Sequence, residues 1–159
     1  MEEDHVIRQA VSADALTSVR ELFQEYWTSF GFTPCFQNFD VELAALPGKY
    51  APPHGRLLLA TVNGQPAGCV ALRPFDATRG EVKRLYVRPQ FRGGGLGKAL
   101  MNALAAEARA IGYCELIADT IPKVMATALA MYERLGFEHT APYSNETPEA
   151  QHIRLRLRP

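Results

Sequence analysis

Residues 82–100 read VKRLYVRPQFRGGGLGKAL, and this stretch limits the fold and its ligand more than any other part of the chain. A strand-like run ends at Val87, a proline turn follows, and glycines stand at positions 93, 94, 95 and 97. A helical pattern begins directly after them. Glycines without side chains let backbone amides approach a ligand closely, and a helix N-terminus adds unpaired donors. The stretch therefore predicts a phosphate site.

The composition is that of one ordinary globular domain. The chain has 159 residues, 47% of them hydrophobic and 21% charged, which is enough for a substantial core. Because 17 Lys and Arg residues balance 17 Asp and Glu residues, we expect neither nucleic acid nor membrane as a partner. The acidic start, MEEDH, indicates no signal peptide. We expect a single cytoplasmic domain over residues 1–159.

The cysteines and histidines show no metal-ligand spacing. The cysteines stand at 35, 69 and 114, and the histidines at 5, 54, 139 and 152. Such scattered cysteines fit reduced thiols, and we expect no metal site.

Hydrophobic periodicity predicts alternating helices and strands. We expect strands over 5–11, 56–62, 67–73, 81–87, 114–118, 137–140 and 151–157. We expect a helix from the Ser12 cap to about Phe30, and further helices over 40–46, 96–111 and 122–135. The order is strand, two helices, three strands, helix, strand, helix and two strands. This order predicts a mixed α/β sandwich and not a regular parallel repeat.

Three kinds of phosphate loop compete for the glycine run. The nucleoside-triphosphate motif GxxxxGK[ST] fails, because Arg92 stands at its first glycine and Ala99 at its hydroxyl residue. The dinucleotide motif GxGxxG lacks its last glycine in either register. The pattern [RQ]xxGx[GA] fits, with Arg92, Gly95 and Gly97.

With this loop and the segment ALAMYERLGF at residues 128–137, essentially the whole chain resembles the GNAT superfamily of acetyl-CoA-dependent N-acetyltransferases. The resemblance implies an α/β fold with a mixed, mostly antiparallel sheet of about seven strands and about four helices. It also implies acetyl-CoA as the co-substrate, a primary amine of a small molecule or peptide as the acceptor, and direct attack in a ternary complex. A non-catalytic CoA-binding module and a homodimer stay open.

The resemblance also implies which residues hold coenzyme A. Backbone amides of Arg92 through Lys98 would hold its pyrophosphate, and a bulge near Leu85–Val87 would expose strand donors, the Leu85 amide facing the oxyanion. The expected cofactor residues are Leu85, Tyr86, Val87, Arg92, Gly93, Gly94, Gly95, Leu96, Gly97 and Lys98.

Two residues are the expected catalysts. Tyr132 stands where relatives carry a tyrosine that protonates the departing thiolate, although it would also suit the inner face of its helix. Glu81 is the expected base for the amine. Alternatively, Glu81 is a surface residue that forms weak ion pairs with Lys83 and Arg84. Many relatives use a water chain and no single dedicated base.

Two parts of the site are less determined by the sequence. Met125 stands where many relatives carry an asparagine that contacts pantetheine, so the backbone, Thr120 or Lys123 would have to supply that contact. For the acceptor site we expect residues from the aromatic segment around positions 26–39 and from later loops. They are Trp27, Phe32, Arg73 and Tyr143, with Asn145 as a further candidate.

Overall fold

The computed structural model describes residues 4–31, 38–144 and 149–157. The strands are β1 (His5–Gln9), β2 (Arg56–Val62), β3 (Gln65–Pro74), β4 (Arg79–Val87), β5 (Glu115–Thr120), β6 (Glu138–His139) and β7 (Gln151–Arg156). The helices are α1 (Ala13–Ser29), α2 (Phe39–Ala45), α3 (Leu96–Ile111) and α4 (Pro122–Arg134), with the short 3-10 helices η2 (Gly48–Tyr50) and η3 (Pro89–Phe91). Every predicted strand and helix is present, whereas the two 3-10 helices were not predicted.

Local signals in the sequence account for several of these element ends. The Ser12 side chain accepts a hydrogen bond from the Ala15 amide at 3.1 Å and so caps α1. Gly112, at a φ of 111°, ends α3 in the left-handed conformation. The predicted strand over 137–140 is shorter than expected, because only Glu138 and His139 pair with β7.

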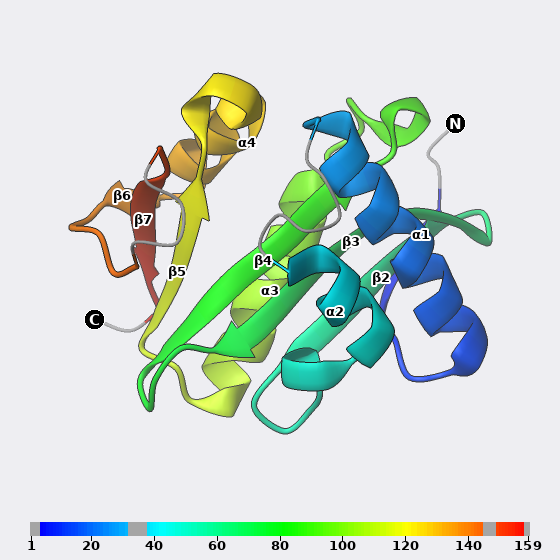
Figure 1. Cartoon of the computed structure of the whole chain (residues 1–159), viewed down its shortest axis with the longest axis horizontal. Coiled ribbons are helices and arrows are strands. Elements are labelled where there is room, and N and C mark those ends of the chain that lie inside the picture. The colour runs from blue at the N-terminus through cyan, green and yellow to red at the C-terminus, as the bar shows by residue number, and fades with distance from the viewer. Residues whose placement is uncertain (1–3, 32–37, 145–148, 158–159) are drawn as a thin grey trace.

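The strands form one seven-stranded sheet in the order β1-β2-β3-β4-β5-β7-β6 (Figure 1). Neighbours are antiparallel except β4 and β5, which are parallel. The mixed, mostly antiparallel sheet with four α-helices confirms the predicted fold class. No helix within the described residues has the length and apolar character needed to cross a membrane.

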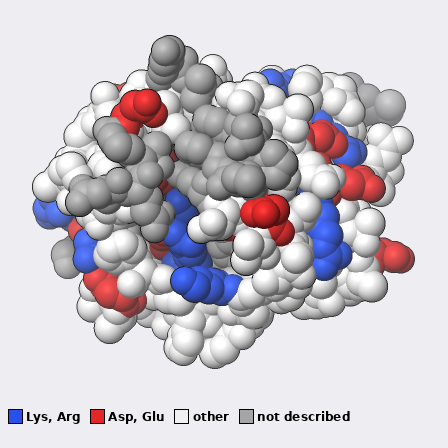
Figure 2. All heavy atoms as spheres, in the orientation of Figure 1, with Lys and Arg blue, Asp and Glu red and all other residues white. Residues whose placement is uncertain are grey.

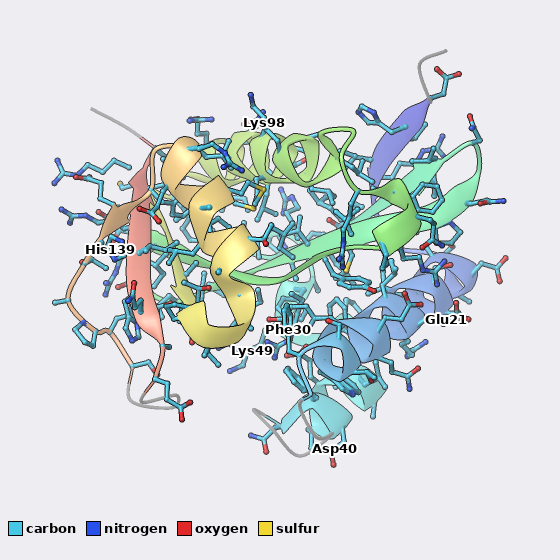
Figure 3. All side chains as sticks on the ribbon, turned by 90° about the horizontal axis from the view of Figure 1, so that it is seen from above. Glu21, Phe30, Asp40, Lys49, Lys98 and His139 are labelled. Atoms are coloured by element: carbon cyan, nitrogen blue, oxygen red, sulfur yellow. The ribbon has the colours of Figure 1, made fainter. Side chains whose placement is uncertain are left out.

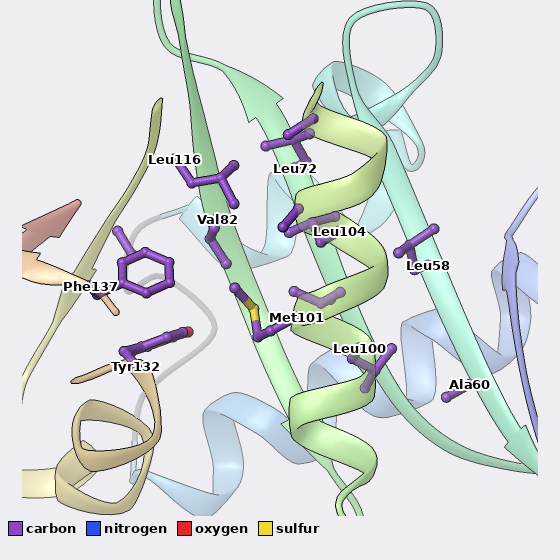
Figure 4. Close-up of a cluster of buried hydrophobic side chains, with 14 of the residues drawn as sticks. Leu58, Ala60, Leu72, Val82, Leu100, Met101, Leu104, Leu116, Tyr132 and Phe137 are labelled. Atoms are coloured by element: carbon purple, nitrogen blue, oxygen red, sulfur yellow. The ribbon is translucent and has the colours of Figure 1, made fainter. Parts of the chain in front are cut away.

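Helices cover both faces of the sheet. Figure 3 shows α3 on one side of it and α1 with α2 on the other. This arrangement explains the unbroken hydrophobic run of β2: Leu57 and Leu59 pack in the cluster with α1, whereas Leu58 packs in the cluster with α3. In Figure 4, Leu100 and Leu104 of α3 lie over the sheet. Burying a leucine side chain fully contributes about 1.5–3 kcal/mol.

β4 and β5 pair over a short distance only and then separate. Their ladder joins Arg79–Glu81 to Glu115–Ile117, and beyond it the two strands diverge (Figure 1). A register shift in the β3–β4 pair sets two residues of β4, Arg84 and Leu85, against one of β3, and Arg84 has a φ of 61°. This is a β-bulge at the place where the family resemblance implied one. The separation opens the middle of the sheet to a ligand.

Candidate active site

Three cavities follow the separation between β4 and β5. The loop cavity, of about 640 Å³, is lined by residues 85–87, 91–93 and 95–98 with one side of α4. The basic cavity, of about 610 Å³, is lined by Asn38, α2, η2 and the side chains Arg73, Lys83 and Arg84. The middle cavity, of about 40 Å³, is lined by residues 82–85, 119–121, Met125 and Tyr132, among others. It shares Leu85 and Met125 with the loop cavity and Lys83 and Arg84 with the basic cavity, so it lies between them.

The loop cavity gathers the predicted cofactor residues. Of the ten, all except Gly94 line it. Gly93 and Gly95 have φ angles of 90° and 82°, a conformation that side-chain-bearing residues adopt at a cost. Gly95 is the N-cap of α3 and offers no side chain to the first amides of that helix. Among the described residues, no acceptor binds the amides of 93–98, so these donors can hold an anion.

Arg92 differs from what the resemblance implied. Its amide already donates to the Pro89 carbonyl at 3.3 Å, so the set of free amides begins at Gly93. Its side-chain Nε donates to the Val87 carbonyl at 2.8 Å, and the guanidinium lies 5.7 Å from the Tyr86 ring centroid. Arg92 can therefore contribute positive charge at the rim but not its amide. Lys98, on the first turn of α3, is exposed and lines the same cavity (Figure 3).

The Tyr132 side chain combines packing with a free hydroxyl. Its ring is buried and lies 5.1 Å from the Phe137 ring (Figure 4), as the packing interpretation expected. Its hydroxyl makes no hydrogen bond with any residue of the described ranges, and the side chain lines the middle cavity. Burial, with the nearby Tyr26 and Asp119, raises the pKa of Tyr132 well above its ordinary value. The phenol therefore stays protonated near neutral pH, which a proton donor requires.

Thr120 brings a second hydroxyl to the middle cavity. The residue is 1% exposed, and its buried Oγ1 has no hydrogen-bond partner among the described residues. Leaving a buried hydroxyl unpaired costs about 1–3 kcal/mol, so this atom is suited to a ligand that supplies the bond. Met125 lines the same cavity, whereas the side chain of Lys123 lies outside the described part. Of the suggested replacements for the missing asparagine, Thr120 is thus placed to offer its side chain in the middle cavity.

Glu81 lies in a buried ion-pair network beside these cavities. Its Oε1 accepts a hydrogen bond from Arg73 Nε at 2.8 Å, and its Oε2 accepts one from the Tyr143 hydroxyl at 3.2 Å. Lys83 Nζ lies 3.6 Å from the same Oε2 and 3.4 Å from Asp119 Oδ1. Three residues that the sequence analysis named separately, Glu81, Arg73 and Tyr143, are thus in contact. The side chain of Glu81 is 5% exposed, and the residue lines none of the three cavities.

The basic cavity holds four cationic residues and one carboxylate. The cations are Lys49, Arg73, Lys83 and Arg84, and the acid is Glu42. Figure 2 shows lysine and arginine atoms side by side near the middle of the face that carries α1 and α2. Of these residues the sequence analysis named only Arg73 for an acceptor.

The other residues that were predicted for the acceptor site do not line the three cavities or lie outside the described residues. Trp27 is 6% exposed, stacks on Phe39 with ring centroids 4.7 Å apart, and lines none of the three cavities. It belongs to the hydrophobic core. Phe32 and Asn145 lie outside the described residues. Tyr143 donates a hydrogen bond to Glu81 and lines none of the three cavities.

Sequence reasoning missed Asp119 and misjudged Lys83 and Arg84. Asp119 lines the middle cavity together with Tyr132, but no motif marks it. Lys83 and Arg84 were considered as surface partners of Glu81, yet they are 6% and 4% exposed. In a regular strand, these two consecutive side chains would point to opposite faces of the sheet. The bulge instead places both of them in the site. Among the described residues, no three His, Cys, Asp or Glu side chains are grouped to hold a metal ion.

Known proteins resemble this chain over nearly its whole length. An uncharacterized N-acetyltransferase of Schizosaccharomyces pombe is 39% identical over 145 residues, 89% of this chain and 88% of that protein. An IAA acetyltransferase of Azospirillum brasilense is 31% identical over 145 residues, 91% of this chain and 90% of that protein. The PaiA N-acetyltransferase of Thermoplasma acidophilum, solved in complex with coenzyme A, covers 96% of this chain and 99% of its own at a TM-score of 0.79. At 17% identity, that likeness shows the fold.

The family match extends over the parts of the chain that build the cavities. Residues 16–137 match the Acetyltransferase (GNAT) family. This range includes the bulged strand, the glycine loop and Tyr132. The chain therefore belongs to the GNAT family of acetyltransferases.

Proposed function

We propose that the protein transfers the acetyl group of acetyl-CoA to a primary amine by direct attack in a ternary complex. The observation that carries this proposal is the middle cavity, which lies between the loop cavity and the basic cavity and is lined by Tyr132. The amine nitrogen forms a bond to the carbonyl carbon, the carbon–sulfur bond breaks, the amine loses a proton and the sulfur gains one. No free cysteine of the described residues lines these cavities, so no covalent acetyl-enzyme is invoked.

The loop cavity is the donor side in this proposal. The free amides of residues 93–98 would hold the diphosphate of acetyl-CoA, with Arg92 and Lys98 adding positive charge. The structurally similar PaiA N-acetyltransferase was solved with coenzyme A, which supports this choice. Acetyl-CoA would supply an activated thioester acyl group. Thr120 Oγ1 would pair with the polar groups that enter the middle cavity.

Tyr132 and the backbone of the bulge would stabilise the negative charges that develop on the departing sulfur and on the carbonyl oxygen. We assign the proton for the departing sulfur to the Tyr132 hydroxyl, which is protonated and has no hydrogen-bond partner among the described residues. Within the part of the chain that the structure describes, β4 has no ladder partner on the β5 side past Glu81, so backbone groups on that side can bind a ligand. The Leu85 amide would be the donor for the negative charge that develops on the carbonyl oxygen.

Asp119 is better placed than Glu81 to take the proton from the amine. Both oxygens of Glu81 are already bonded, to Arg73 and to Tyr143. Asp119 lines the middle cavity, and Lys83 at 3.4 Å is its only hydrogen-bond partner among the described residues. We therefore propose Asp119 as the proton acceptor and Glu81 as the residue that positions Arg73 for the acceptor.

Donor binding is tested by replacing Gly95 with glutamate. Acetyl-CoA at about 100-fold its Kd adds about 2.7 kcal/mol, which should raise the Tm of a chain of this size by about 5–10 °C. Gly95→Glu should abolish the shift, because it adds strain and negative charge at the loop. Gly64→Glu is a matched control: Gly64 has a φ of 81° and is equally open, but lies in the β2–β3 hairpin. An unchanged wild-type Tm would contradict donor binding.

Tyr132→Phe tests the proton donor. The variant keeps the packing against Phe137, so Tm and acetyl-CoA affinity should stay near wild type, whereas kcat should fall about 10²–10⁴-fold. The assay is thiol release with a panel of amines. Tyr113→Phe is the control, because the hydroxyl of Tyr113 binds the His54 carbonyl at 2.7 Å, away from the cavities. Equal kcat in wild type and Tyr132→Phe would remove Tyr132 from the chemistry, and no turnover with any amine would favour a binding-only module.

Asp119→Asn and Glu81→Gln separate the two carboxylates. Asp119→Asn should lower kcat about 10²-fold or more at neutral pH, because a carboxamide cannot accept the amine proton. Glu81→Gln should mainly raise KM for the acceptor, because Arg73 loses its charged partner. If kcat falls only in Glu81→Gln, the base is Glu81 and our assignment of Asp119 is wrong.

A further inference from the structure

The acids around the basic cavity are already paired with protein groups. Glu42 Oε2 accepts a hydrogen bond from Arg84 Nε at 2.9 Å, and its Oε1 accepts one from Arg84 Nη2 at 2.9 Å. The Tyr50 hydroxyl donates to the same Oε1 at 2.8 Å. Behind the cavity, Glu81 is held by Arg73 and Tyr143. No carboxylate of the described wall is therefore left to bind a cationic group on a ligand.

Cationic donors, in contrast, remain available in the same cavity. Arg73 donates a hydrogen bond from Nε to Glu81, whereas its two terminal nitrogens have no acceptor among the described residues. The Arg73 side chain is 25% exposed. Lys49, on η2, is exposed and has no ion-pair partner within the described part of the chain. Both line the basic cavity.

The charges of the side chains around the basic cavity also favour an anionic ligand. Lys49, Arg73, Lys83 and Arg84 are the four cations of the cavity wall. Within the described part of the chain, three acids touch this set: Glu42, Glu81 and Asp119. Among these residues the cations therefore outnumber the acids by one. A bound anion would balance this excess, whereas a polycationic amine would meet repulsion.

We propose that the acceptor is a small primary amine that carries an anionic group, which Arg73 and Lys49 bind in the basic cavity while the amine enters the middle cavity. This inference rests on the proposed function. A guanidinium presents a planar pair of donors that matches a carboxylate in two parallel hydrogen bonds, so a carboxylate is the first anion to test. A cavity of about 610 Å³ has the size of a small-molecule site.

The specificity is tested with pairs of amines in which an anionic carboxylate is replaced by a neutral amide of similar size. β-Alanine is compared with β-alaninamide, and glycine with glycinamide, in the thiol-release assay. Because a hydrogen bond to a charged group contributes more than one to a neutral group, kcat/KM should be about 10-fold or more higher for the acids. A comparison of kcat/KM for O-phosphoethanolamine and ethanolamine tests whether the bound anion is a phosphate and not a carboxylate. Spermidine is the cationic comparison and should be the poorest acceptor.

Two variants connect the preference to the cavity. Arg73→Gln and Lys49→Gln should each raise KM for the anionic amines about 10-fold, and the increase for the neutral amines should be much smaller. Because Arg73→Gln also frees Glu81, Lys49→Gln is the variant that leaves the buried network intact. Arg156→Gln, which removes an exposed charge from β7, should leave both sets unchanged.

Binding supplies a readout that does not depend on turnover. With coenzyme A present, titration with β-alanine should raise the Tm more than titration with β-alaninamide, and Lys49→Gln should remove the difference. Equal responses to acid and amide, in binding and in kcat/KM, would overturn the anion site while leaving acetyl transfer intact. Failure of the proposed function is a separate result, in which acetyl-CoA neither raises the Tm nor loses its acetyl group to any amine.

Discussion

The early end of the β4–β5 ladder is the constraint on which the rest of the site depends. The two strands share a ladder at Arg79–Glu81 and Glu115–Ile117, and the bulge at Arg84–Leu85 turns β4 away from further pairing. Backbone groups in a sheet need partners, so strands that separate inside a sheet leave donors and acceptors for a ligand. Here the separation also joins the loop cavity to the basic cavity through the middle cavity.

Buried charge defines the acceptor side of this opening. Glu81, Lys83 and Arg84 are each at most 6% exposed, and burial of a lone charge is costly. They are tolerated because each has a partner: Arg73 for Glu81, Asp119 for Lys83, and Glu42 for Arg84. Removing one partner of such a pair typically costs about 3–5 kcal/mol. The network therefore holds the wall of the basic cavity in one arrangement and fixes the direction of its remaining donors.

The sequence predicted what depends on local signals. The Ser12 cap and the glycine that ends α3 mark element boundaries, and these two helices are where they were expected. The glycine loop could also be predicted from the sequence, because its φ angles and its position before α3 depend on residues close in the chain.

Contacts between segments that are distant in the chain could not be predicted from local sequence signals. The pairing of Glu81 with Tyr143 joins residues 62 positions apart. Trp27, which was expected at the acceptor site, packs in the core, where Phe39 stacks on it. Asp119 carries no motif, and the left-handed Arg84 breaks the alternation from which strand faces are predicted. The site therefore combines a donor half that the sequence indicates with an acceptor half that the fold assembles.

A crystal structure of the protein with coenzyme A bound would test the central claim, that the chemistry takes place where β4 and β5 separate. The account predicts the diphosphate on the amides of residues 93–98. It also predicts the sulfur in the middle cavity, within hydrogen-bond distance of the Tyr132 hydroxyl, and a partner for Thr120 Oγ1. A complex in which the sulfur lies outside the separation of the two strands, away from Tyr132, would contradict it.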